Sequence, residues 1–131
     1  MKTNEKSIGS NVLYPELSYE IVGALFEVHS TLGCGFLEKV YENALICELK
    51  RRGITCNQQV ALQVGYKGNI VGEYVADVIV DGKVLIELKV VRKLENIHRA
   101  QVMNYLKATG LRLGLLVNFA NPKLDCERIA F

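Results

Sequence analysis

Hydrophobic residues change their spacing along this sequence from helical to alternating and back, and this change limits the chain to a fold that mixes helices with strands. From residue 18 to 52 they recur at helical intervals, which indicates helices at 18–32 and at about 36–52, separated by Gly33-Cys34-Gly35. Between residues 54 and 91 they alternate with polar residues or form β-branched runs, which indicates strands. Helical spacing returns from Leu94 to Thr109.

The strand region divides at two turns. A first strand reaches a turn near 67–69, and residues 71–80 and 83–91 form the next two strands, joined by a hairpin turn at Asp81-Gly82. Later, an apolar run from Leu113 to Phe119 indicates a buried strand, and residues 128–131 indicate an edge strand. The order is therefore helix, helix, three-strand meander, helix, strand, which fits one mixed β-sheet with helices on both faces, an α/β fold.

Length and composition favour one globular domain. The chain has 131 residues, of which 50% are hydrophobic and 23% charged. We expect a polar leader at 1–17 and a single domain at 18–131. The leader lacks the apolar stretch of a signal peptide and no segment is long enough to span a bilayer, so we expect a cytoplasmic protein without a membrane partner.

Two function classes find little support in the composition. The net charge of +2 is too small to indicate a strongly basic nucleic-acid-binding domain. The cysteines at 34, 47, 56 and 126 include no Cys-x-x-Cys pair and no histidines at zinc-finger spacing, so a zinc site is not expected. We expect these cysteines to be free thiols buried as small hydrophobes.

The strongest chemical signal is a set of lone charges in apolar strands. Glu87 and Lys89 are two positions apart in one strand, so both side chains lie on the same face. Asp77 stands in the apolar run of the preceding strand, where a buried acid needs a metal ion, a proton or a cation to compensate it. A divalent metal held by Asp77 and Glu87, with Lys89 orienting water or stabilising developing charge, is suited to phosphodiester hydrolysis. Oxygen ligands favour Mg²⁺ or Mn²⁺.

Other interpretations remain open. Lys89 could simply neutralise one acid in a purely structural domain, although this leaves a second inward acid unexplained. The fold could also serve as a catalytically silent nucleic-acid-binding or regulatory interaction module. The catalytic hypothesis carries a geometric condition, because a two-residue turn at Asp81-Gly82 would pair Asp77 with Ile86 and turn it away from Glu87. The site therefore requires a three-residue loop or a β-bulge.

The arrangement of Asp77 followed by Glu87-Leu88-Lys89 across a hairpin resembles the motif of the PD-(D/E)xK nuclease superfamily, with Ala76 in place of the proline. The stretch from Gly35 to Tyr41 is similar to the Gly-x-x-Glu-x-x-Tyr motif of the GxxExxY proteins, a branch of that superfamily. Further similarities extend over roughly residues 20 to 120. The resemblance implies a restriction-endonuclease-like core and a metal-dependent nuclease.

The resemblance also suggests roles for residues outside the strands. It implies that Glu38 joins Asp77 and Glu87 at the metal directly or through water, whereas the helix dipole alone would also explain an acid there. Tyr41, on the same helical face, is interpreted as a packing and hydrogen-bonding residue. Gln101 and Tyr105 resemble a Gln-x-x-x-Tyr element that braces the lysine or touches substrate, but an ordinary helix face explains them equally well.

The remaining expectations concern partners. Arg92 and Lys93 follow the lysine strand and are candidate phosphate contacts, with a solvated face as the alternative. The favoured substrate is DNA rather than RNA, by analogy alone. Few loops are available to grip DNA, so a homodimer or a protein partner is a further expectation. His29 and His98 are interpreted as structural residues.

Overall fold

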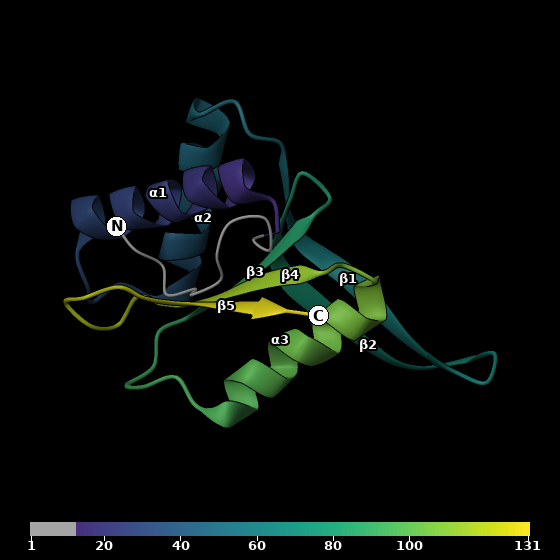
Figure 1. The fold of residues 1–131 in the computed structure, drawn as a ribbon. Helices are drawn as coiled ribbons and strands as arrows, with labels where there is room; N and C mark the ends of the chain where they lie inside the picture. The colour runs from purple at the N-terminus through teal and green to yellow at the C-terminus, as the bar shows by residue number, and fades with distance from the viewer. Residues whose placement is uncertain (1–12) are drawn as a thin grey trace.

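A five-stranded mixed sheet forms the centre of the protein, with helices on both of its faces (Figure 1). The computed structural model describes residues 13–131. The elements follow the order α1 (Pro15–Leu32), α2 (Glu38–Arg51), β1 (Cys56–Tyr66), β2 (Asn69–Val80), β3 (Val84–Lys89), α3 (Asn96–Thr109), β4 (Leu113–Asn118) and β5 (Asp125–Ala130). The strands are arranged as β1-β2-β3-β4-β5, antiparallel throughout except for the parallel pair β3 and β4. This architecture confirms the expected mixed sheet with helices on both faces.

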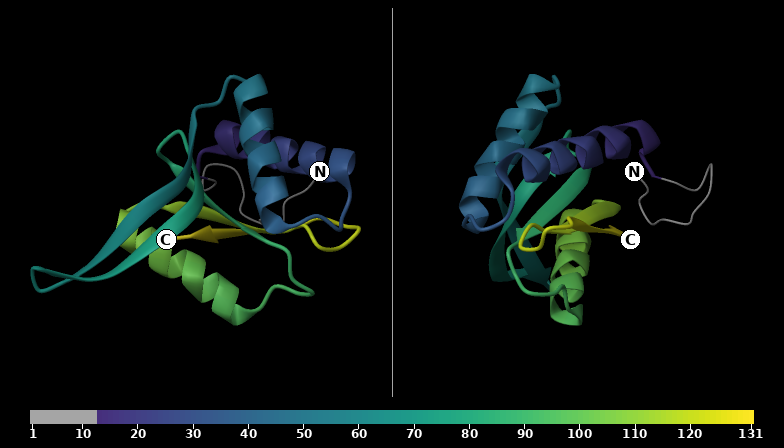
Figure 2. Two further views of the ribbon diagram at one scale, coloured as in Figure 1. Left: turned by 180° about the vertical axis from the view of Figure 1, so that it is seen from behind. Right: turned by 90° about the vertical axis from the view of Figure 1, so that its left-hand side faces the viewer.

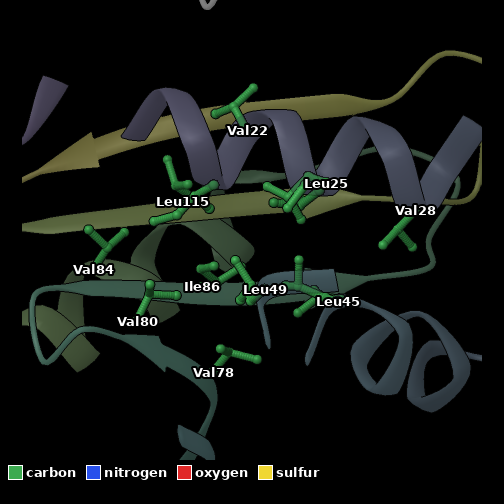
Figure 3. Close-up of a cluster of buried hydrophobic side chains, with 14 of the residues drawn as sticks. Val22, Leu25, Val28, Leu45, Leu49, Val78, Val80, Val84, Ile86 and Leu115 are labelled. Atoms are coloured by element: carbon green, nitrogen blue, oxygen red, sulfur yellow. The ribbon is translucent and has the colours of Figure 1, made fainter. Parts of the chain in front are cut away.

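The helices divide the hydrophobic core in two. α1 and α2 pack on one face of the sheet and α3 packs on the other, as the two views of Figure 2 show. The larger cluster joins both N-terminal helices to the strands through fully buried side chains such as Leu25, Leu45 and Ile86 (Figure 3). Val102 and Leu106 of α3 pack in the second cluster. Each buried leucine or isoleucine contributes roughly 1.5–3 kcal/mol, so both faces hold the helices firmly against the sheet.

Several boundaries differ from the sequence-based expectation. α1 begins at Pro15 rather than residue 18, because proline is well suited to the first turn of a helix, and Ser18 lies inside it with its hydroxyl donating to the Leu13 carbonyl. α2 begins at Glu38, two residues later than expected. β5 begins at Asp125, three residues earlier. Residues 1–12 of the expected leader lie outside the described residues.

The cysteines are free thiols, as expected, but not all are buried. Cys34 and Cys47 are exposed, and Cys56 and Cys126 are partly buried. The expectation of buried cysteines was therefore wrong for the first two, which lie in the turn before α2 and on its outer face. None of the helices in the described part of the chain has the length and apolar character that a membrane span requires.

α3 approaches the sheet closely at a glycine. A Cβ atom placed on Gly114 of β4 would lie 2.6 Å from Cγ1 of Val102, which is too close for any side chain. The absence of a side chain there lets α3 pack directly against β4. This contact sets how near α3 and its residue Tyr105 lie to the strands that carry the charged residues.

Candidate active site

The loop between β2 and β3 satisfies the geometric condition for the proposed acid pair. Val80 pairs with Val84 and Val78 pairs with Ile86, so residues 81–83 form a three-residue loop. Asp81 and Gly82 both adopt positive φ, at 54° and 63°. The same register continued by one position places Asp77 across from Glu87, on the same side of the sheet. Of the two expected devices, a three-residue loop or a β-bulge, the loop is present.

The ladder between β2 and β3 stops just before the two acids meet. Its last backbone pair is Val78 with Ile86. Beyond it, the Asp77 N–H donates to Oε2 of Glu87 at 2.9 Å, and the Leu88 N–H donates to Oδ2 of Asp77 at 2.9 Å. Each carboxylate thus takes the place of a backbone acceptor on the opposite strand. The reciprocal bonds hold the two carboxylates beside one another where the strands separate.

The alternation of side chains between the two faces of the sheet breaks in β2 at Asp77. Val78 packs with the α1 and α2 core, as does Val80, but Ala76 packs with the α3 core. Strict alternation would place all three on one face, so the pattern breaks at Asp77. On the neighbouring strand, the β1 and β2 ladder passes from Gln58 to Val60 without a pair at Gln59, whose φ is 55°. Asp77 therefore lies at a distortion shared by two strands.

Burial, and then the charge of a neighbouring acid, shift the pKa values of Asp77 and Glu87 upward. Glu87 is only 3% exposed, and its burial, followed by the charge of Asp77, raises its pKa to about 8. Burial likewise raises the pKa of Asp77, despite the hydrogen bond from Leu88. Lys89 opposes the shift in both groups. The raised pKa values mean that the protein's own hydrogen bonds and positive charges do not fully offset the cost of ionising these two carboxylates.

The donor set fits a divalent cation. Two carboxylates that face each other provide hard oxygen ligands, and Mg²⁺ commonly uses one or two protein carboxylates together with water and phosphate oxygens. Within residues 13–131, no group of three or more His, Cys, Asp or Glu side chains is arranged to hold a metal ion. Asp77 and Glu87 are the two neighbouring acids that could hold a cation.

The comparisons with known proteins identify the family. A model of the PD-(D/E)XK nuclease superfamily matches residues 15–129. The chain belongs to this superfamily. No curated protein matches the sequence significantly.

Two solved structures resemble this PD-(D/E)XK chain. The crystal structure of SSO0001 has a TM-score of 0.58 and 19% identity, covering 89% of this chain and 59% of SSO0001. An alkaline exonuclease (LHK-Exo) from Laribacter hongkongensis has a TM-score of 0.48 and 14% identity, covering 81% of this chain and 75% of that chain. This chain thus spans less than two thirds of the length of SSO0001, and the likeness to SSO0001 concerns the fold.

Glu38 lies at the start of α2, near enough to Asp77 for the two charges to interact. Its side chain is exposed, yet partial desolvation and then the charge of Asp77 raise its pKa, while Lys89 lowers it. Glu38 therefore belongs to the same electrostatic cluster as Asp77 and Lys89. Its exposure leaves the carboxylate free to adjust toward a ligand.

Tyr41 fixes the turn that positions Glu38. Its buried hydroxyl donates to the Gly33 carbonyl at 2.6 Å and accepts from the Phe36 N–H at 3.2 Å, and its ring stacks on Phe119 with centroids 4.6 Å apart. Gly35, in the same turn, has a φ of 113°, which favours glycine. The interpretation of Tyr41 as a packing and hydrogen-bonding residue is confirmed.

We expect Tyr41→Phe to lower the free energy of unfolding by about 1–2 kcal/mol, because it leaves the Gly33 carbonyl and the Phe36 N–H without their partner. Urea denaturation measures the change. Tyr19→Phe is the matched control. Tyr19 is 73% exposed, so removal of its hydroxyl should leave stability unchanged. Equal stability of Tyr41→Phe and wild type would contradict this role.

Glu42 is a buried acid that the sequence analysis did not single out. It is 2% exposed and accepts hydrogen bonds from Lys39 at 3.2 Å, from Gln58 at 2.7 Å and from Gln59 at 2.9 Å. Adjacent strand residues normally point to opposite faces, but the positive φ of Gln59 lets both glutamines reach Glu42. The charge of Glu42 raises the pKa of Asp77 and of Glu38. The available signal was its position four residues after Glu38, on the same helical face.

Gln101 and Tyr105 of α3 contact each other, and Tyr105 interacts with the charges of the two acids. Gln101 Nε2 donates to the Tyr105 hydroxyl at 3.1 Å. Burial and then the charge of Glu87 raise the pKa of Tyr105. Tyr105 also packs in the second hydrophobic cluster, so it serves both the core and the wall of the site.

Arg92 and Lys93 are exposed in the connection between β3 and α3. Buried Asn118 holds this connection, since its Oδ1 accepts from the Val91 N–H and its Nδ2 donates to the Val91 carbonyl. Asn121 donates to the Arg92 carbonyl at 3.3 Å. The backbone after Lys89 is thus held by side chains at the end of β4 and just after it, while both basic side chains face solvent.

The two histidines make structural contacts. His29 is buried, with Nε2 2.9 Å from the Asn121 carbonyl oxygen. His98 accepts from the Glu95 N–H in a capping box at the start of α3. Both contacts support the interpretation of these residues as structural.

Proposed function

We propose that this protein is a metal-dependent nuclease that hydrolyses phosphodiester bonds, with DNA favoured over RNA. Asp77 and Glu87 would hold Mg²⁺ or Mn²⁺, and Glu38 would contribute directly or through water. The observation that carries the proposal is the reciprocal hydrogen bonding of half-buried Asp77 and buried Glu87, two acids whose pKa values are raised despite the charge of Lys89. We also propose that the chain is a member of the GxxExxY branch, on the strength of Gly35, Glu38 and Tyr41.

Each side chain has a part in the proposed reaction. When bound, the metal ion would polarise a phosphoryl oxygen and lower the pKa of bound water. The ammonium group of Lys89 would stabilise negative charge that develops on the phosphoryl group, or orient the attacking water. Tyr105 and Gln101 would define the wall against which the substrate lies. Arg92 and Lys93 would contact phosphates outside the reacting centre.

The setting of the activity is also part of the proposal. A single catalytic domain at 18–131 would act in the cytoplasm, and a homodimer or a partner protein would enlarge the surface available to DNA. A silent binding module on the same fold is the alternative. Buried acids favour the enzyme over that alternative, because a module without catalysis has no use for two repelling carboxylates.

Calorimetry with Mn²⁺ tests the metal site. We expect the wild type to bind Mn²⁺ and Asp77→Asn to lose binding by at least about tenfold, because one of two anionic ligands is gone. Asp81→Asn, an exposed aspartate in the loop after β2, is the matched control and should bind as the wild type does.

Cleavage of labelled single-stranded DNA, duplex DNA and RNA with Mg²⁺ or Mn²⁺ then tests the reaction. Cleavage by the wild type and not by Asp77→Asn supports the nuclease. Equal Mn²⁺ binding by both proteins, or metal binding without any cleavage, would favour the silent module.

A further inference from the structure

A groove of about 790 Å³ runs between the β1–β2 hairpin and α3, and it extends beyond the two residues, Gln101 and Tyr105, that the proposed reaction uses. Its hairpin wall includes Gln63 and Tyr74. Its α3 wall includes Ile97, Gln101 and Tyr105. Figure 2 shows the hairpin continuing past the rest of the sheet on the side of α3. The groove is therefore an open channel built by two rigid elements.

Tyr105 connects this groove to the candidate active site. It lines the groove and belongs to the same hydrophobic cluster as Ala76, which precedes Asp77, and burial together with the charges of Glu87 and Asp77 raises the pKa of its hydroxyl. Gln101 lines it too and donates to the same hydroxyl. A ligand in the groove would consequently lie next to whatever is bound at the acid pair.

The groove exposes apolar groups on both of its walls. Tyr74 is 51% exposed, with its ring centroid 5.6 Å from that of Tyr105 at an interplanar angle of 44°. Across the groove, Ile97 is 71% exposed. Each wall therefore offers an exposed apolar surface, one of them aromatic, on which a flat group can pack.

The polar groups in the groove suit a nucleobase and its phosphate. Gln63 and Asn104 provide amide donors and acceptors for a base edge, and Lys107 provides a cation. A net charge of +2 gives the chain little general attraction for phosphates, so affinity must come from other contacts. Stacking and base-edge contacts are the chemistry this groove provides.

We propose that the groove binds an unpaired nucleobase next to the phosphate at the acid pair, so that the substrate is a single strand or a locally unpaired segment. This inference rests on the proposed nuclease function and specifies its substrate class. In a duplex, both faces of a base are covered by its neighbours, and the groove could not reach them.

Fluorescence binding with a short single-stranded DNA carrying 2-aminopurine tests the inference in EDTA, where no metal-dependent cleavage occurs. We expect the wild type to change the probe's fluorescence and to bind it more tightly than the same probe in a duplex. Tyr74→Ala should weaken binding about tenfold, as expected for one lost stacking contact. Tyr74→Phe keeps the ring and should bind as the wild type does.

Two further variants separate the groove from general effects. Tyr66→Ala removes a tyrosine that is 60% exposed on the same hairpin but does not line the groove, and it should leave binding unchanged. Ala100→Trp fills the groove from an exposed position of α3 and should weaken binding as Tyr74→Ala does. Circular dichroism confirms that each variant is folded. An RNA version of the probe reports which sugar is preferred.

The inference is overturned if Tyr74→Ala and Ala100→Trp bind the single strand as the wild type does, or if the duplex binds more tightly. Because this assay contains no metal ion, its result is independent of Mn²⁺ binding and cleavage. Groove binding without cleavage under any metal condition would reject the nuclease and retain the groove. Metal-dependent cleavage by the wild type, together with unchanged binding by Tyr74→Ala and Ala100→Trp, would retain the nuclease and reject the groove.

Discussion

Lys89→Met is expected to lower the rate of metal-dependent cleavage by about 10²–10³-fold while Mn²⁺ binding persists. A single group that stabilises developing charge commonly contributes this much. Methionine retains the length and apolar stem of lysine and removes only the charge, so the packing of β3 should be kept. Single-turnover cleavage at saturating Mn²⁺ measures the effect.

The same substitution should also move metal binding to higher pH. Lys89 lowers the pKa values of Glu38, Asp77 and Glu87, so its removal raises them further. Protons then compete with Mn²⁺ up to a higher pH. Lys83→Met is the control, because Lys83 is 52% exposed and pairs with Asp81 in the hairpin loop. Cleavage by Lys89→Met at the wild-type rate would remove the lysine from the proposed mechanism.

Glu87→Gln is expected to raise the free energy of unfolding of the metal-free protein by on the order of 4 kcal/mol at pH 8. The pKa of Glu87 is about 8 in the folded protein against an ordinary value of 4.5. Between these pH values the native state keeps a proton that the unfolded chain has lost, so wild-type stability falls as pH rises. Glutamine carries no such proton, so the stability difference should grow through this window and level off above pH 8.

Urea denaturation in EDTA at several pH values from 5 to 9 measures this difference. Glu127→Gln provides a control of opposite sign, because the hydrogen bond from Arg99 lowers the pKa of Glu127. The ionised Glu127 carboxylate stabilises the folded protein above the pKa that it has in the unfolded chain, and this stabilisation is lost as pH falls through the lower pKa of the folded state. Glu127→Gln should therefore be less stable than the wild type at pH 8. A pH-independent gain in Glu87→Gln would contradict the assigned cause. Added Mn²⁺ should stabilise the wild type and not Glu87→Gln.

Local patterns in the sequence were sufficient for most of the architecture. The change from helical to alternating spacing predicted three helices and the strand meander, because a helix or strand buries one face whatever its neighbours are. The order of elements then implied a mixed sheet with helices on both faces. Boundaries were less accurate, as at Pro15 and Glu38, because they depend on where the chain meets its packing partners.

Candidate site residues could be found partly by the same reasoning. Lone charges in apolar strands identified Asp77, Glu87 and Lys89, since a buried charge is costly without a compensating partner. Glu42 escaped notice because a glutamate on a helix is usually exposed, and its burial depends on Gln58 and Gln59 from a strand that follows α2. The groove beside Tyr74 was equally hidden, because its walls come from elements separated along the chain.

The sequence by itself determined which segments are helical or extended and which charges lie in apolar surroundings, because both follow from residues close together in the chain. Only the tertiary structure decided that the loop at 81–83 has three residues and that Asp77 consequently faces Glu87. The physical reason is the two-residue period of a strand: one residue more or less in a turn moves every following side chain to the other face. The sequence therefore identifies Asp77 and Glu87 as candidate acids, and the register of β2 against β3 determines that they lie side by side.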